Sequence, residues 1–251
     1  MASARIFVWG GTVAAMEMKR DYYEDLRLLD SPAQVFWLLL LLAVLTALPF
    51  LASNYLLYTL NLMAIHVIVA LGLNLLIGYT GQISLGHAGF FAIGAYATLG
   101  LMTQAGLPFW LALPLAGLIS AGFGFLLGLP ALRLEGPYLA IATLGFGLTI
   151  TQILGRLEAF GGHMGLQAPP LTVFGLAIDN DAARYAVIMP VCVVLAWALR
   201  NLTRTRVGRA FVAIRDSDIA ASCIGVNLTY YKTLAFAVSA FYTGVGGGLM
   251  A

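Results

Sequence analysis

The sequence predicts an all-α protein, a polytopic transmembrane helical bundle, and two observations carry that prediction. Of its residues, 61% are hydrophobic and only 10% are charged. No Asp, Glu, Lys or Arg occurs between Asp30 and Arg133. A helix crosses a bilayer with about 20 apolar residues, so an uncharged stretch of this length must cross several times.

The chain divides into a charged lead-in and an apolar remainder. Residues 1–34 contain the run EMKRDYYEDLRLLD without a small-residue cleavage site, so we expect a cytoplasmic N-terminal lead-in rather than a secretory signal. Residues 35–251 are expected to form a transmembrane domain of about seven spans. Apolar runs place the spans at about 35–52, 55–77, 83–102, 109–129, 138–154 and 184–199, and from about 231 onward. The last run stops at Ala251 amid small residues, and we expect the natural chain to continue.

One glycine-rich stretch does not suit a plain lipid-facing helix. Gly72 to Tyr96 reads GLNLLIGYTGQISLGHAGFFAIGAY, with polar side chains among its glycines. Breakable backbone and polar side chains are tolerated at membrane depth where they are buried in protein or line a watery cavity. Close helix packing is the alternative explanation for any single glycine. We predict a broken helix whose candidate path or gate residues are Asn74, Gly81, Gln82, Ser84, Gly86 and His87.

The Lys and Arg residues predict an orientation in the membrane. We place the N-terminus in the cytoplasm and let the chain cross about seven times. All but two of the 13 Lys and Arg residues then fall on the cytoplasmic side, the exceptions being Arg156 and Arg184. This bias follows the excess of positive charge in cytoplasmic loops.

Residues 201–229 form a basic cytoplasmic loop with helical character. Ala210, Phe211 and Ile214 can share one helical face, with Arg209 and Arg215 beside it. We therefore predict a first amphipathic helix under the membrane.

A second short helix follows in the same loop, at about 219–224. Residues 216–218 (Asp-Ser-Asp) offer N-caps for it, and Gly225 suits the position just after its end. One interpretation is an amphipathic segment lying on anionic lipid. The compact, capped form favours docking to a protein instead.

The chain resembles the branched-chain amino-acid permease family of ATP-binding-cassette importers. The basic loop followed by YYKTLAFAVSAFYTGVGGGLMA looks like the cytoplasmic coupling segment of such permeases. The glycine-rich stretch, LPALRLEGPYLAIATLGFG and GGHMGL match the family's pattern in order and spacing. The resemblance covers residues 32–251, although Phe160 and Ser222 depart from the residue types expected there.

The resemblance implies the permease subunit of an ATP-driven importer, with residues 35–251 as its permease domain. The expected partners are a second permease subunit, ATP-binding-cassette ATPase subunits, an external substrate-binding protein and the lipid bilayer. The expected location is the bacterial inner membrane, with several passes and a cytoplasmic N-terminus. Branched-chain or other small neutral amino acids, or urea and short amides, are the implied substrates. The residues expected to couple to the ATPase are Gly208, Arg209, Phe211, Ile214, Arg215, Asp216, Asp218 and Gly225.

Other classes of protein fit the sequence less well. Lys19 and Lys232 are the only lysines, and neither lies in a phosphate-binding GxxxxGK[ST] motif, so ATP hydrolysis is expected in a partner. An ion-coupled secondary transporter stays open as the alternative, although the predicted spans lack the carboxylate that proton coupling generally uses. The arrangement expected of an enzyme is also missing, because the histidines in the spans have no carboxylate partner there. We expect no catalytic residues, no cofactor, no metal and no nucleic-acid partner.

Overall fold

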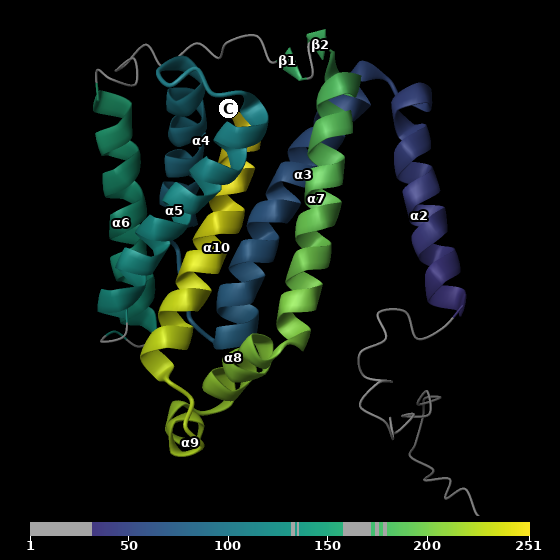
Figure 1. The fold of residues 1–251 in the computed structure, drawn as a ribbon. Coiled ribbons are helices and arrows are strands. Elements are labelled where there is room, and N and C mark those ends of the chain that lie inside the picture. The colour runs from purple at the N-terminus through teal and green to yellow at the C-terminus, as the bar shows by residue number, and fades with distance from the viewer. Residues whose placement is uncertain (1–31, 132–133, 135, 158–171, 174–175, 178–179) are drawn as a thin grey trace, which may run out of the picture. The chain divides into compact units, whose positions relative to one another are not determined.

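The computed structural model describes residues 32–131, 134, 136–157, 172–173, 176–177 and 180–251. The chain separates into two compact units, residues 1–48 and 49–251. Residues 1–31 of the predicted lead-in and the GGHMGL motif lie outside the described residues, as does Arg133; residues 32–34, also assigned to the lead-in, begin the first helix. The first described element, α2 (Pro32–Leu51), is an apolar helix with exposed Phe36 and Trp37 side chains (Figure 1).

Long helices make up the second unit, which confirms the predicted all-α polytopic class. They are α3 (Asn54–Asn74), α4 (His87–Thr103), α5 (Phe109–Ala131), α6 (Pro137–Arg156), α7 (Asp181–Arg204) and α10 (Leu228–Met250). Among the described residues, five helices are long and apolar enough to cross a membrane: α3 with its extension, α5, α6, α7 and α10. Two strands of two residues each, β1 (Thr172–Val173) and β2 (Leu176–Ala177), pair antiparallel before α7.

Local chemistry sets several helix ends. The Ser53 side chain accepts a hydrogen bond from the Leu56 amide at the start of α3, and Asn227 caps α10 in the same way. Pro137 opens α6 at a position where its missing N–H costs nothing. The preceding Gly136 has φ +55°, a conformation that side-chain-bearing residues rarely adopt.

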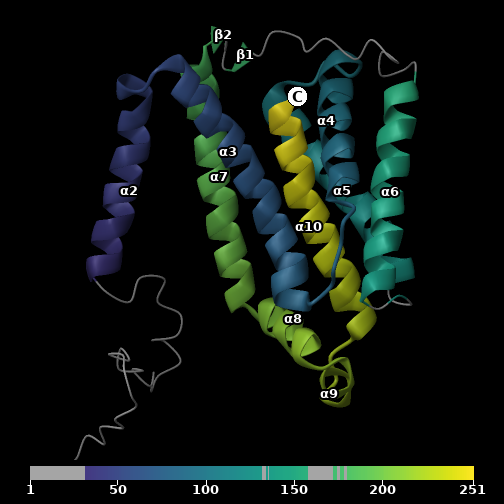
Figure 2. The same cartoon turned by 180° about the vertical axis from the view of Figure 1, so that it is seen from behind.

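The centre of the second unit is α10, which α3, α4 and α5 surround (Figures 1 and 2). In its apolar stretch 67% of the residues are buried, against 39% or less in the other four span candidates. Small residues allow this close packing: a Cβ on Gly94 of α4 would collide with the Gly244 carbonyl of α10, and one on Gly247 would collide with the Phe91 carbonyl. Helices in membranes commonly associate through such small-residue contacts.

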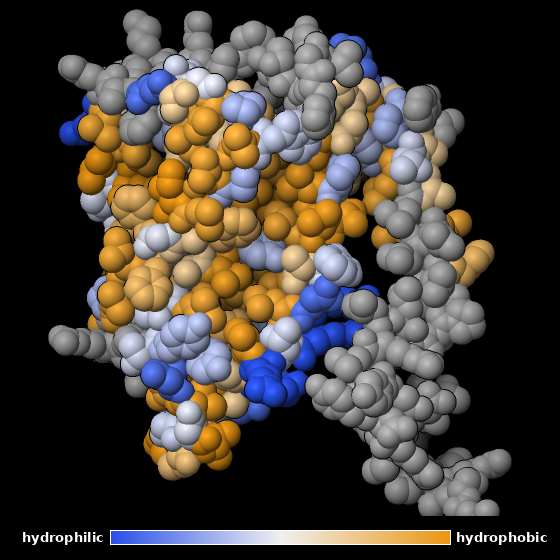
Figure 3. All heavy atoms as spheres, in the orientation of Figure 1, coloured by the Kyte–Doolittle hydropathy of each residue, from blue (hydrophilic) through white to orange (hydrophobic). Residues whose placement is uncertain are grey.

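The outer faces of the helices are apolar, as a bilayer requires. Figure 3 shows hydrophobic residues covering the middle of the bundle, while hydrophilic residues gather at the lower end, where α7 ends. Large apolar side chains are exposed on α5, α6 and α7, including Leu126, Ile141 and Val194. Because these side chains are apolar and exposed, they are suited to contact lipid.

Candidate functional site

The predicted broken helix is present between α3 and α4. The last turn of α3 continues as a π-helix, η1 (Leu75–Tyr79), and residues 81–86 are not helical. Figure 2 shows this extended segment (residues 81–86) rising from the lower end of α3 to the middle of the bundle, where α4 begins. The expected start of the third span near 83 was wrong, because the helix begins only at His87.

Hydrogen bonds satisfy several of the backbone polar groups that have no helical partner at the break. Thr80 Oγ1 donates to the Leu76 carbonyl at 2.6 Å, and the Gln82 amide donates to the same carbonyl at 3.1 Å. Further along, the Leu85 amide donates to Thr143 Oγ1 of α6 at 3.0 Å. Gly81 allows the turn out of the helix, with φ +70°. A non-helical backbone is stable at membrane depth only when its polar groups find such partners.

The polar side chains of the extended segment point into protein. Gln82, Ser84 and His87 are all buried. Gln82 Nε2 donates to Thr80 Oγ1 at 3.0 Å, and Ser84 Oγ accepts from the Gly86 amide at 3.4 Å. Two of the predicted path residues differ from these in burial, because Asn74, at the end of α3, and Gly81, at the start of the extended segment, are exposed.

His87 belongs to a relay that links three helices. Its Nε2 lies 2.8 Å from Ser239 Oγ of α10, and that hydroxyl donates to the Gly72 carbonyl of α3 at 2.7 Å. Because the single Ser239 hydrogen is used for Gly72, Nε2 must carry the proton and donate. The other ring nitrogen, Nδ1, is buried and has no hydrogen-bond partner among the described residues. Sequence reasoning missed Ser239, which lies 152 positions from His87.

Gly86 lies where α4 meets α6. A Cβ added at this position would be 2.5 Å from the Thr143 carbonyl oxygen, a backbone atom that has little freedom to move. Gly89 and Gly147 pack closely one turn further along. Because these glycines have no side chains, the start of α4 packs directly against the backbone of α6.

Two short helices lie at the end of the bundle where η1 ends (Figure 1). They are α8 (Arg206–Asp216) and α9 (Asp218–Cys223), close to the two helices predicted from the loop. Ser217 caps α9 by accepting from the Ala220 amide. Gly225 follows with φ +86° and donates to the Ser222 carbonyl at 3.0 Å, while Val226 donates to Ala221. This pair of bonds is a Schellman motif, which explains the glycine at that position.

The apolar face of α8 is directed into the chain's own core. Phe211 and Ile214 are 0% and 3% exposed, and the Phe211 ring packs edge-on against Tyr231 at 6.3 Å between centroids. These side chains therefore cannot enter a partner's groove, which corrects that part of the expectation. Their burial attaches α8 to the bundle, and an amphipathic pattern alone does not reveal which surface covers the apolar face. Gly208 is similarly internal, because a Cβ there would collide with the Thr203 backbone.

Arg215 connects α8 to the broken helix. Its Nη1 donates to the Gly78 carbonyl of η1 at 3.0 Å, and its Cγ lies 3.2 Å from where a Gly81 Cβ would be. The adjacent Asp216 carboxylate pairs with the guanidinium at 3.1 Å. This contact was not predicted, because Gly78 and Arg215 are 137 positions apart. The helix pair, which consists of α8 and α9, is thus in direct contact with the broken helix through Arg215.

Other residues of the helix pair are attached to the bundle or exposed. The Asp218 carboxylate forms an ion pair with Lys232 in the first turns of α10, which ties α9 to the central helix. Arg209 is exposed. Two large apolar side chains that sequence reasoning missed, Ile219 and Ile224, are 78% and 75% exposed. Both cysteines are free.

An apolar helical bundle with five span candidates among the described residues, a broken helix and two short helices at one end is the architecture of a polytopic membrane protein. The family described as branched-chain amino acid transport system, permease component, matches residues 55–251, and the chain belongs to it.

Curated relatives agree with this assignment. The high-affinity branched-chain amino acid transport system permease protein LivM of Salmonella typhimurium is 37% identical over 243 residues, covering 87% of this chain and 57% of the relative. LivM of Escherichia coli matches with the same identity and coverage. The chain thus spans less than two thirds of the length of these relatives. No solved structure matches.

Proposed function

We propose that the chain is the membrane-spanning permease subunit of an ATP-driven importer. It would carry branched-chain or other small neutral amino acids, or urea and short amides, with the energy supplied by ATPase subunits. A second permease subunit and an external substrate-binding protein would complete the complex. The observation that carries this proposal is the Arg215–Gly78 hydrogen bond, which joins the helix pair to the broken helix. A displacement of the helix pair by a partner would act directly on the extended segment.

The surroundings of the extended segment suit an uncharged or zwitterionic solute. From α3 through α5 the described residues carry no Asp, Glu, Lys or Arg, and Gln82, Ser84 and His87 supply neutral polar groups. A solute with a net charge would find no counter-charge in such surroundings to compensate for its lost hydration, whereas the two charges of a zwitterion compensate each other in part. This chemistry is compatible with leucine, isoleucine and valine and with small amides.

The exposed tip of the helix pair supports docking to an ATPase subunit. Ile219 and Ile224 expose apolar surface on and just after α9, and Arg209 and Asp216 expose charge on α8. Full burial of one such aliphatic side chain contributes about 1.5–3 kcal/mol, while charges at the rim set orientation more than affinity. A groove with an apolar floor and a charged rim would be complementary to this tip.

Transport by the complete complex tests the proposed function. The permease is reconstituted in proteoliposomes with its ATPase and binding-protein partners, and uptake of radiolabelled leucine is measured with and without ATP. We expect uptake only with ATP, together with leucine-stimulated ATP hydrolysis. Uptake that needs no ATP and follows a sodium or proton gradient would instead establish an ion-coupled secondary transporter.

We propose that the end of the bundle with α8 and α9 faces the cytoplasm of the inner membrane. Arg200, Arg204, Arg206, Arg209, Arg215 and Lys232 lie at this end, and Arg156 and Arg184 lie at the opposite end. This distribution follows the positive-inside rule.

Thiol labelling tests this orientation. In this orientation the chain around the GGHMGL motif is expected outside the cell, but it lies outside the described residues. The exposed Ala105, between α4 and α5, is therefore the better external site. In a Cys192→Ser background, the native, exposed Cys223 is expected to react with an impermeant maleimide only in inverted vesicles. Ala105→Cys in a background without other cysteines is expected to react in intact cells. The reverse pattern would overturn the orientation.

A further inference from the structure

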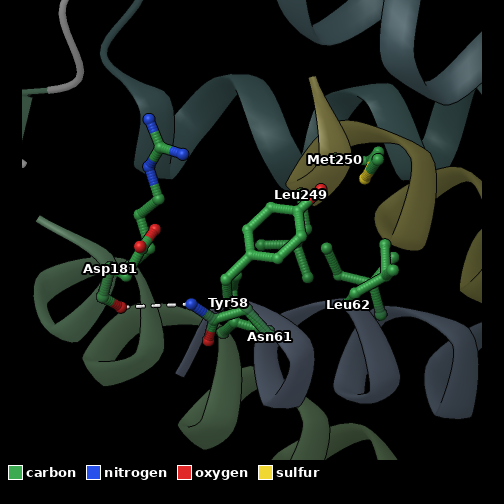
Figure 4. Close-up of a pocket in the computed structure, with 9 residues that line it drawn as sticks. Tyr58, Asn61, Leu62, Asp181, Leu249 and Met250 are labelled. Carbon is green, nitrogen blue, oxygen red and sulfur yellow. Dashed lines mark hydrogen bonds between the residues drawn. The ribbon is translucent and has the colours of Figure 1, made fainter. Parts of the chain in front are cut away.

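A second polar site lies at the opposite end of the bundle from the helix pair. It is a pocket of about 120 Å³ between the start of α3, the start of α7 and the end of α10. Figure 4 shows the Tyr58 ring reaching from α3 toward Leu249 and Met250 of α10, with Asp181 on the other side of the pocket. A water molecule requires roughly 10–15 Å³ of such space, so the pocket has room for a small organic molecule.

The pocket combines both signs of charge. Asp181 and Arg184, one turn apart in the first turns of α7, both line it. Neither the Asp181 carboxylate nor the Arg184 guanidinium forms an ion pair within the described part of the chain. Two unpaired opposite charges at one small pocket are complementary to a zwitterion, because each end of such a ligand meets its counter-charge.

A buried amide adds an independent observation. Asn61 lines the same pocket and is only 6% exposed. Its Nδ2 donates to the Asp181 backbone carbonyl at 3.1 Å, which fixes the amide, but Oδ1 is buried and accepts no hydrogen bond from the described residues. Because Oδ1 has no accessible surface, a ligand in the pocket does not reach it. The amide acts through Nδ2, which holds the start of α7, and with it Asp181, against α3.

Apart from Tyr58 and Met250, the remaining lining is aliphatic. It consists of Leu62 and Ile65 of α3, Ile188 of α7 and Leu249 of α10. Ile65 and Ile188 are buried, so they form a fixed apolar wall. A ligand with a branched aliphatic side chain would place that side chain against the wall while its charged groups meet Asp181 and Arg184.

We propose that this pocket is an entry site for a zwitterionic amino acid with an aliphatic side chain. The ammonium group contacts the Asp181 carboxylate, the carboxylate contacts Arg184, and the side chain packs on the aliphatic wall. The assignment rests on the proposed import function, because the pocket then opens on the side where an external binding protein releases its substrate. It precedes the extended segment in the path.

Equilibrium binding of radiolabelled leucine to the purified complex, without the external binding protein, tests the site. Two competitors separate the charges: 3-methylbutylamine lacks the carboxylate, and 4-methylpentanoate lacks the ammonium group. For Arg184→Gln we expect leucine affinity to fall about tenfold or more while the affinity for the amine is unchanged. For Asp181→Asn we expect leucine affinity to fall while the affinity for the acid is unchanged.

Arg156→Gln is the matched control. Arg156 is also an exposed arginine at this end of the bundle, in the last turn of α6, and it does not line the pocket. Equal leucine affinity in Arg184→Gln, Arg156→Gln and the unmodified complex would overturn the proposal. An equal loss of amine and leucine affinity in Arg184→Gln would also overturn it, because the amine has no group for Arg184 to bind.

The side-chain end of the site has its own test. Leu62→Trp is expected to fill the aliphatic part of the pocket and to weaken leucine binding more than alanine binding, and an equal effect on both would count against the assigned orientation.

Failure of this proposal is distinguishable from failure of the proposed function. If the unmodified complex shows ATP-driven leucine uptake but Arg184→Gln leaves the affinity for leucine unchanged, the pocket assignment alone is wrong.

Discussion

Replacing Arg215 with alanine is expected to reduce ATP-driven uptake about tenfold or more while ATP hydrolysis continues. The variant loses the hydrogen bond from the guanidinium to the Gly78 carbonyl, and with it the hydrogen-bonded connection between α8 and η1, which leads into the extended segment. A hydrogen bond to a charged group contributes about 1.5–3 kcal/mol when shielded, and the Arg215 side chain is 46% exposed, so its effect on stability is smaller. The expected loss is in coupling, measured as substrate transported per ATP hydrolysed.

Two variants make this prediction specific. Arg209→Ala removes the same charge from the same helix without touching η1, and we expect it to change the transport-to-hydrolysis ratio less than Arg215→Ala. Arg215→Lys keeps the charge but loses the planar fork of donors, so an intermediate ratio is expected. Equal uncoupling by Arg209→Ala and Arg215→Ala would show that the charge of α8, and not its contact with Gly78, is what matters.

Replacing Gly86 with valine is expected to abolish uptake. The added Cβ would come within 2.5 Å of the Thr143 carbonyl oxygen, so α4 and α6 would have to separate. Overpacking of a tight contact costs about 1–3 kcal/mol, which a membrane bundle of this size tolerates without unfolding. We therefore expect the complex to assemble, with the extended segment displaced from Thr143. Leucine uptake and co-purification of the ATPase subunits are the two measurements.

The matched control is Gly145→Val on α6. Gly145 is exposed, and a Cβ added there would meet none of the described atoms within 4 Å. We expect normal uptake from this variant. If Gly86→Val takes up leucine as well as Gly145→Val does, the contact of Gly86 with Thr143 is not needed for transport. The proposed role of the extended segment in transport would then be wrong.

Much of the architecture follows from the sequence, for definite physical reasons. The absence of charge from 31 to 132 predicts membrane helices, because a helix in lipid satisfies its own backbone. Gly225 predicts the end of α9, because the Schellman turn requires a positive φ. In both cases the signal lies within a few residues of the feature that it predicts.

The contacts that make up the site could not be predicted in this way. His87 meets Ser239, and Arg215 meets Gly78, only because distant helices pack side by side. Phe211 was correctly placed on an apolar face, but periodicity does not distinguish a face that is covered by the same chain from one that is covered by a partner. The protruding Ile219 and Ile224 are apolar residues in a polar loop, and that contrast was the available signal.

The π-helical turn at Leu75–Tyr79 winds the end of α3 more widely than the α-helix that precedes it. Each π-helical hydrogen bond spans one residue more than an α-helical bond, so rewinding this turn as α-helix exchanges one set of backbone bonds for another. The chain after it would then turn by about 100° around the helix axis and advance by about 1.5 Å. Arg215 holds the Gly78 carbonyl within this turn. The guanidinium therefore contacts the turn whose rewinding as α-helix would rotate Gln82 and Ser84 around the helix axis.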